Sequence, residues 1–189
     1  MGRLYTFDAF LKAASTIQDV KINKDFGCVM LELKIDGWKD ILGKIDEADL
    51  QEEKGLETEP HVTVLYGIHD WDEPKEKVKE LVLQFKRPVV ELTGVSIFEN
   101  EKFDVVKIDV KSKDLAAMNA KLTSDLQCTV KFPDYHAHAT IAYVKPGCGK
   151  KYKGMEIKLP EDEIILSKVL YSMSDKKKIT YDMPDEQGE

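Results

Sequence analysis

Two short stretches, far apart in the chain, carry the same pattern of residues. Residues 61–66 read His-Val-Thr-Val-Leu-Tyr, and residues 138–143 read His-Ala-Thr-Ile-Ala-Tyr. Both run His, small apolar, Thr, β-branched, apolar, Tyr, and this composition predicts a strand in each place. Side chains two positions apart in a strand point to the same face. Each predicted strand therefore presents an imidazole beside a hydroxyl.

This combination of side chains suits the cleavage of a phosphodiester. The reaction needs a base for the attacking oxygen and an acid for the leaving oxygen, and a histidine with its ordinary pKa of ~6.5 can be either. His61 and His138, placed on opposite sides of one phosphorus, permit in-line displacement without a metal. Thr63 and Thr140 can hold the non-bridging oxygens while negative charge develops on them. We expect these four residues to be catalytic, with base and acid unassigned.

Outward from the two motifs, helices alternate with strands. The apolar spacing predicts helices at about 7–17, 38–45, 75–85 and 115–126. It predicts strands at about 28–35, 61–67, 89–98, 103–110, 137–144, 164–172 and 179–183. The turn at 99–102 joins two of these strands as an antiparallel hairpin. This order predicts an α+β chain with the character of a split βαβ unit.

Length and charge limit the classes of function. The chain has 189 residues and a net charge of −7, which fits one domain and argues against a general binder of duplex DNA or RNA. No apolar run reaches the ~18 residues that span a bilayer, and the N-terminus lacks a signal-peptide core. The three cysteines are far apart and odd in number, which predicts free thiols and a cytoplasmic protein. They are Cys28, Cys128 and Cys148.

With these residues in view, the chain resembles the 2H phosphoesterase superfamily. The mark of that family is a pair of His-x-Thr/Ser motifs on the central strands of two pseudo-symmetric lobes, and its members act on RNA ends and on 2′-5′ linkages. The match falls on His61, Thr63, His138 and Thr140. The resemblance implies two β-sheet lobes with helices outside, around a central cleft. They would occupy residues 27–172 of a single domain, with an N-terminal extension (1–26) and an acidic tail (182–189).

Residues 59–68 also resemble a narrower, phage-encoded branch of this superfamily, the anti-CBASS nucleases. That resemblance implies a cofactor-free hydrolase that cleaves 3′-5′ bonds of cyclic di- or trinucleotide signals in the host cytoplasm. Two other activities stay open: a 2′,3′-cyclic or 2′-5′ phosphodiesterase acting on RNA ends, and a non-catalytic protein that sequesters nucleotides. The sequence leaves the oligomeric state open.

Four further residues are candidates for substrate contact. Trp71 follows the first motif and Tyr135 precedes the second, so their rings are placed to stack on bases. Ordinary packing explains Trp71 equally well and is the preferred explanation for Tyr135. His136 lies at the entrance of the second strand. Lys145 begins a lysine-rich segment that predicts a local basic rim. Tyr66 and Tyr143 are expected to point away from the motif face.

His136 and His138 also form a His-x-His pair, which is a possible zinc motif. A metal there would have to recruit Asp134, His61 or His69 from elsewhere, because no further ligand follows directly. We therefore expect no metal.

Overall fold

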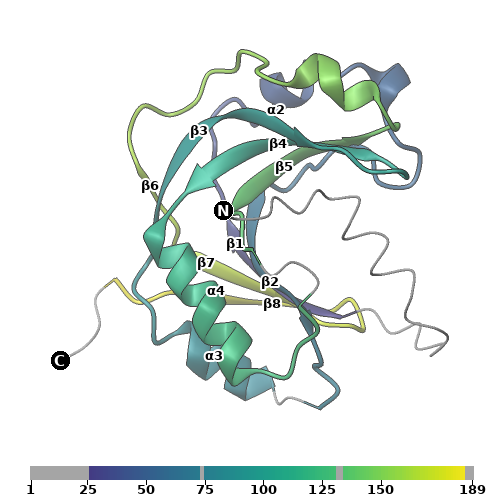
Figure 1. Ribbon diagram of the computed structural model, residues 1–189. Coiled ribbons are helices and arrows are strands. Elements are labelled where there is room, and N and C mark those ends of the chain that lie inside the picture. The colour runs from purple at the N-terminus through teal and green to yellow at the C-terminus, as the bar shows by residue number, and fades with distance from the viewer. Residues whose placement is uncertain (1–25, 73–74, 131–133, 186–189) are drawn as a thin grey trace, which may run out of the picture.

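The computed structural model describes residues 26–72, 75–130 and 134–185 (Figure 1). Its centre is a strongly curled antiparallel sheet of eight strands in the order β6-β3-β4-β5-β2-β1-β7-β8. The strands are β1 (Gly27–Glu32), β2 (His61–Ile68), β3 (Val89–Phe98), β4 (Asp104–Lys111), β5 (His138–Val144), β6 (Ile164–Ile165), β7 (Lys168–Ser172) and β8 (Lys178–Asp182). The helices are α2 (Trp38–Leu42), α3 (Lys75–Val82) and α4 (Lys113–Asp125), with 3-10 turns η1 (Glu47–Asp49) and η2 (Cys148–Tyr152).

The α+β class is confirmed, and most predicted elements are present. The predicted strand at 164–172 is two strands, β6 and β7, which pair with different neighbours. The helix predicted near 38–45 is shorter, because α2 ends at Leu42 before Gly43. The helix predicted at 7–17 lies outside the described residues.

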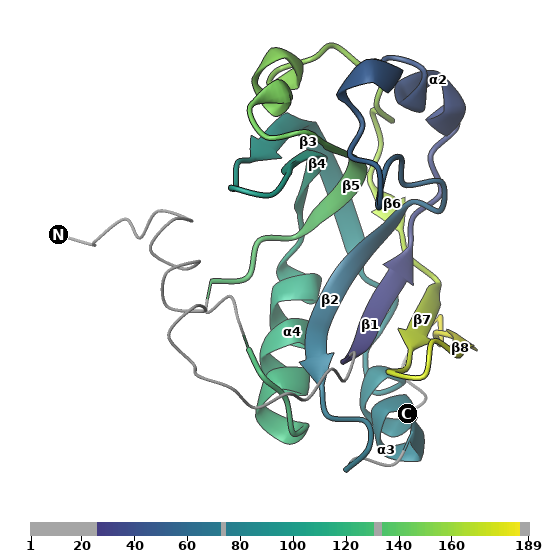
Figure 2. The ribbon, with the colours of Figure 1, turned by 90° about the vertical axis from the view of Figure 1, so that its right-hand side faces the viewer.

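Two halves of the sheet meet at the middle of the two motifs. Strands β2 and β5 share one pair of Cα partners, Val62 and Ala139 (Figure 2). Beyond that pair each strand bonds to another segment: Leu50 and Leu56 bridge to the end of β5, and Cys128 bridges to Ile68 at the end of β2. The halves β6-β3-β4-β5 and β2-β1-β7-β8 therefore diverge from the motif strands.

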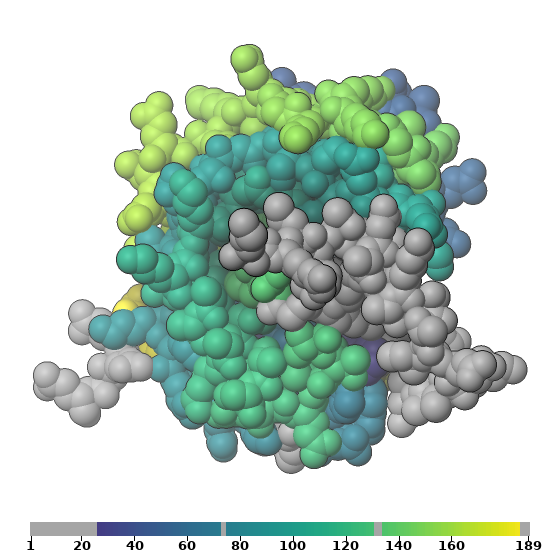
Figure 3. All heavy atoms as spheres, viewed as in Figure 1, coloured from purple at the N-terminus to yellow at the C-terminus, as the bar shows by residue number. Residues whose placement is uncertain are grey.

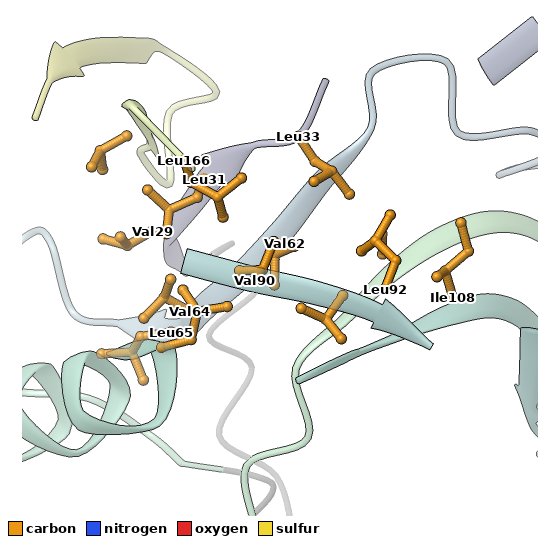
Figure 4. Packing of buried hydrophobic residues seen from close by; sticks show 14 of the residues in the cluster. Val29, Leu31, Leu33, Val62, Val64, Leu65, Val90, Leu92, Ile108 and Leu166 are labelled. Atoms are coloured by element: carbon orange, nitrogen blue, oxygen red, sulfur yellow. The ribbon is translucent and has the colours of Figure 1, made fainter. Parts of the chain in front are cut away.

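One face of the sheet forms the core. Val29 and Leu31 on β1 and Val62 on β2 are fully buried, and they lie together in the cluster shown in Figure 4. Helix α4 lies against β2, where Asn119 Nδ2 donates a hydrogen bond of 2.7 Å to the Val64 carbonyl. Three buried residues of α4 belong to the same core: Leu115, Met118 and Leu122. The alternate residues of β1 are only half-buried, so the opposite face of the sheet is more open.

Both motif strands contain a β-bulge one residue after the threonine. On β2, Leu65 pairs with Val29 and Thr63 with Met30, which leaves Val64 as the extra residue. On β5, Ala142 pairs with Val106 and Thr140 with Lys107, which leaves Ile141 as the extra residue. A bulge shifts the alternation of side chains by one position.

The bulges place Tyr66 and Tyr143 on the same face as the histidines and threonines. The expectation that these tyrosines point away was therefore wrong, because simple alternation along an unbroken strand does not apply here. Tyr66 is 45 % exposed, and Tyr143 is half-buried.

The inner strands of the two halves, β2-β1 and β5-β4, are related by a pseudo-twofold axis through the pair Val62 and Ala139. Each of these residues is the middle position of its His-x-Thr motif, and the bulges are equivalent. The flanking strands also match: residues 28–34 read Cys-Val-Met-Leu-Glu-Leu-Lys, and residues 105–111 read Val-Val-Lys-Ile-Asp-Val-Lys. The symmetry therefore extends to four strands, β4-β5-β2-β1.

Gly67, the second-last residue of β2, provides a test of this arrangement. Its φ is +109°, and an added Cβ would lie 2.3 Å from the Thr129 carbonyl oxygen. We expect Gly67→Ala to lower the free energy of unfolding by about 3 kcal/mol or more, because strain and a backbone clash add. Chemical denaturation measures this.

The matched control is Gly154→Ala, because Gly154 has a φ of +73° but open space around its Cβ position. This control should cost only about 1 kcal/mol. Equal losses in the two variants would contradict the close approach of Thr129 to β2.

Candidate active site

The pairing of β2 with β5 brings the four motif residues to one face. In an antiparallel pair, directly opposite residues share a face and their chain neighbours share the other face. Val62 and Ala139 are opposite each other and point into the core, so the residues on either side of them point to the open face. His61 and His138 are then diagonal neighbours, about 7–8 Å apart at the backbone. That spacing suits two imidazoles that flank one phosphorus.

The two imidazoles are oriented in the same way by the backbone. His61 Nδ1 lies 2.8 Å from the carbonyl oxygen of Glu59, and His138 Nδ1 lies 2.7 Å from that of His136. Each carbonyl belongs to the residue two positions before its histidine. A carbonyl can only accept, so Nδ1 carries the hydrogen in both rings. Nε2 is therefore the nitrogen that can accept or donate the transferred proton.

Each threonine has a polar neighbour on the same face. Thr140 is 8 % exposed and is hydrogen bonded to Tyr143. Burial raises the pKa of the Tyr143 hydroxyl, and the bond to Thr140 opposes this only in part. Thr63 is hydrogen bonded to Cys28, whose pKa burial raises to about 12. The Cys28 thiol is thus protonated at neutral pH and is no nucleophile.

Two of the predicted contact residues lie beside the motifs. The Tyr135 hydroxyl donates a hydrogen bond of 2.9 Å to the Thr63 carbonyl, so this residue ties the approach to β5 onto β2. Burial raises the pKa of Tyr135. His136 is exposed, and its carbonyl rather than its ring contacts His138.

Trp71 belongs to an aromatic cluster at the far end of β2. Its ring stacks on His69 at 4.9 Å between centroids and lies 5.8 Å from Phe26, which also contacts Tyr66. Tyr66 is the next residue after Thr63 on the motif face, because the bulge at Val64 is the extra residue between them. The aromatic cluster therefore begins directly beyond Thr63 along β2.

The predicted basic rim lies elsewhere. Lys145 is at the other end of β5, about 20 Å from His138 along the strand, and its Nζ donates to the Ala48 carbonyl at 2.7 Å. Lys150 pairs with Glu99, and Lys151 pairs with Asp46 and Asp49. These lysines are therefore engaged by oxygens of the protein, and the structure does not bring them to the motif residues.

A polar group that the sequence analysis missed lies beside His138. Lys107 on β4 is the Cα partner of Thr140, and Asp109 is that of His138. Lys107 is 4 % exposed and contacts Asp109, Ser96 and the ring of Phe98. The sequence pattern that could have revealed this group is the alternation of Lys107 and Asp109 with valines and isoleucine. This pattern places both polar residues on one face of a strand.

The surroundings of His138 favour its neutral form. Burial is the largest cause that lowers the pKa of His138, and the charges of Lys107 and His61 lower it further. The hydrogen bond to His136 and the charge of Asp109 act in the opposite direction without reversing the shift. The effect of the His61 charge on His138 agrees with their shared face.

Within residues 26–72, 75–130 and 134–185, no three His, Cys, Asp or Glu side chains come together as ligands for a metal ion. The absence of a metal from the reaction remains a prediction. No helix in these same ranges is long and apolar enough to cross a membrane. The three cysteines are free thiols, as expected.

Comparison with known proteins identifies the fold. No family model matches the sequence, and neither does any curated protein. Usb1 of Kluyveromyces marxianus superposes with a TM-score of 0.56 and 12% identity, over 85% of this chain and 99% of that chain.

Two further solved structures give lower scores. A phosphoesterase has a TM-score of 0.48 and 11% identity over 85% of this chain and 96% of its own, and the E. coli LigT complexed with phosphate has 0.44 and 13% over 85% and 95%. The likeness to Usb1 shows a shared fold, a mixed α+β chain with a curled antiparallel sheet.

The orientation of the two imidazoles can be tested without a substrate. When neutral, both His61 and His138 should carry their hydrogen on Nδ1, because each Nδ1 faces a carbonyl. Nitrogen chemical shifts in ¹⁵N-labelled protein above pH 8 distinguish the two tautomers. His69 is the internal comparison, since its Nε2 faces the Thr129 hydroxyl, which can donate or accept. Hydrogen on Nε2 of His61 or His138 would contradict the described site.

Proposed function

We propose that this protein is a metal-independent phosphodiesterase of the 2H type. The observation that carries the proposal is the equivalence of His61 and His138. Both lie on one face beside a threonine, are related by the pseudo-twofold axis, and are held through Nδ1 by a carbonyl two residues earlier. A binding protein needs no such matched pair of proton donors and acceptors.

The arrangement supports in-line displacement at phosphorus. One Nε2 removes the proton from an attacking hydroxyl, which is either the 2′-hydroxyl of the substrate or a water molecule. The new O–P bond forms while the bond from phosphorus to the leaving oxygen breaks. The other Nε2 delivers a proton to that oxygen. Thr63 and Thr140 occupy the other diagonal of the same four positions, where their hydroxyls can donate to the non-bridging oxygens as negative charge increases.

For the substrate we propose the 3′-5′ bonds of small cyclic oligonucleotide signals. The net charge of −7 and the pairing of the surface lysines with acidic groups disfavour long nucleic acids. The cluster of Tyr66, His69 and Trp71 offers aromatic faces near the motif face, and bases stack on such faces. The resemblance to the anti-CBASS nucleases adds the biological setting, a phage protein that removes an immune signal in the host cytoplasm.

The catalytic proposal makes a direct prediction about two substitutions. His61→Ala and His138→Ala should each lower kcat by about 1,000-fold or more, because one step of proton transfer is lost in each. EDTA should leave the rate of the unmodified protein unchanged. Product release from a labelled substrate measures both effects.

Thr180→Val is the control, since Thr180 lies exposed on β8 at the sheet edge and should keep full activity. Loss of activity in EDTA would replace the proposed mechanism with a metal-dependent one at the His136 and His138 pair.

The substrate proposal is tested by comparing cyclic di- and trinucleotides, 2′-5′ oligoadenylate, 2′,3′-cyclic AMP and structured RNA. We expect cyclic oligonucleotides to give the highest kcat/KM. Replacing the 2′-hydroxyl beside the cleaved bond with hydrogen should stop cleavage, because the internal nucleophile is then absent. Preference for RNA ends would contradict the choice of substrate, and tight binding without product over hours would contradict the enzyme assignment.

A further inference from the structure

The pseudo-twofold axis makes one difference between the two halves conspicuous. On β1, Glu32 is the partner of His61 and Met30 that of Thr63. On β4, Asp109 is the partner of His138, and Lys107 that of Thr140. The carboxylates correspond, but Lys107 has Met30 as its equivalent. A buried cation is therefore present beside the second motif and has no counterpart at the equivalent position beside the first.

Lys107 is built into the sheet and does not extend toward a ligand. Its side chain is 5 % exposed. Its ammonium donates to the Ser96 hydroxyl at 2.6 Å and to Asp109 Oδ1, and it lies 4.2 Å from the centroid of the Phe98 ring. The Phe98 ring in turn meets the His138 ring in a T-shaped arrangement, with 5.1 Å between centroids. Two oxygens and a ring face thus fix the ammonium beside His138.

Asp109 holds Lys107 instead of orienting His138. A carboxylate opposite a histidine commonly accepts from Nδ1, but Nδ1 of His138 donates to the His136 carbonyl. The carboxylate accepts from Ser96 at 2.8 Å and from Lys107. Burial alone would raise the pKa of Asp109, yet these hydrogen bonds and the charge of Lys107 lower it. Lys107 and Asp109 therefore form an ion pair at neutral pH.

The charged groups around the two histidines differ. His138 faces Lys107 and Asp109 from β4, Phe98 from β3 and His61 from β2, and of the two β4 charges Lys107 has the larger effect. Glu32 is the partner of His61 on β1, and the charge of His61 acts on Glu59, which also pairs with Lys178 of β8 at 3.0 Å. A nearby cation disfavours a protonated imidazole, and nearby carboxylates favour one.

We propose that Lys107 is a positioning residue that sets the direction of proton transfer, so that His138 begins the reaction as the base and His61 as the acid. This inference rests on the proposed phosphodiesterase function. In the first step Nε2 of His138 takes the proton of the attacking hydroxyl as the O–P bond forms. Nε2 of His61 gives its proton to the leaving oxygen as the second P–O bond breaks. Exchange with water then returns both rings to their starting states.

The test compares two substitutions that should act in opposite directions. Lys107→Met copies the residue found at the equivalent position on β1 and removes the cation, so the acid limb of the kcat/KM profile should move to higher pH. We expect a loss of roughly five- to tenfold at pH 6 and less than about twofold at pH 8.5. Asp109→Asn removes the opposing charge and should move the same limb to lower pH. A purely structural role would lower the rate at every pH in both variants.

Two controls separate charge from packing. Lys107→Arg keeps the cation and should keep the acid limb in place. Lys121→Met removes another ion-paired lysine, the partner of Asp125 on α4, and should change nothing. Proton NMR titration of the ring signals gives an independent measure, in which Lys107→Met should raise the pKa of His138.

The outcomes distinguish this inference from the proposed function. If Lys107→Met moved the alkaline limb of the kcat/KM profile instead, His138 would be the acid and His61 the base, and the inference would be overturned. An unchanged His138 titration would do the same, even if the unmodified protein cleaves phosphodiesters. If the unmodified protein cleaves none of the substrates, the proposed function fails, and the NMR titration still reports whether Lys107 controls the protonation of His138.

Discussion

The site depends on one contact between two strands, the pairing of Val62 on β2 with Ala139 on β5. Both residues are fully buried, so their packing in the core fixes this register. A slip by one residue would turn a histidine and a threonine of one strand into the core. Because the two halves of the sheet diverge on either side of this pair, the motif residues lie where the halves meet. In Figure 3, β3 and β4 of one half lie above and α4, which packs on the other half, lies below.

The backbone around the two histidines is symmetric, but the side chains beside them differ. The equivalent bulges and carbonyl contacts orient His61 and His138 alike, as a two-sided attack on one phosphorus requires. Acid-base catalysis also requires that the two rings start in different protonation states. The difference between Lys107 and Met30 supplies that inequality from the neighbouring strands, without disturbing the placement of the rings. Residues on the neighbouring strands thus decide which histidine is the base and which is the acid, a choice that the repeated motif alone leaves open.

The sequence predicted those parts of the site that depend on local pattern. The His-x-Thr repeat, its β-branched residues and the alternation in a strand were sufficient to expect four side chains in two equivalent strands. The bulges were not predictable, because the consecutive buried residues Val64 and Leu65 also fit a strand covered on both faces, and the directions of Tyr66 and Tyr143 were wrong for that reason. Lys107 and the position of Lys145 depend on which strands become neighbours, which a single sequence does not reveal.

The most direct test is a crystal structure of the protein with a cyclic dinucleotide that lacks its 2′-hydroxyls and resists cleavage. The account predicts one phosphate with oxygens within hydrogen-bonding distance of Nε2 of both His61 and His138, and with at least one threonine hydroxyl on a non-bridging oxygen. A phosphate that contacts only one of the two rings, or a ligand bound on another face of the sheet, would contradict it.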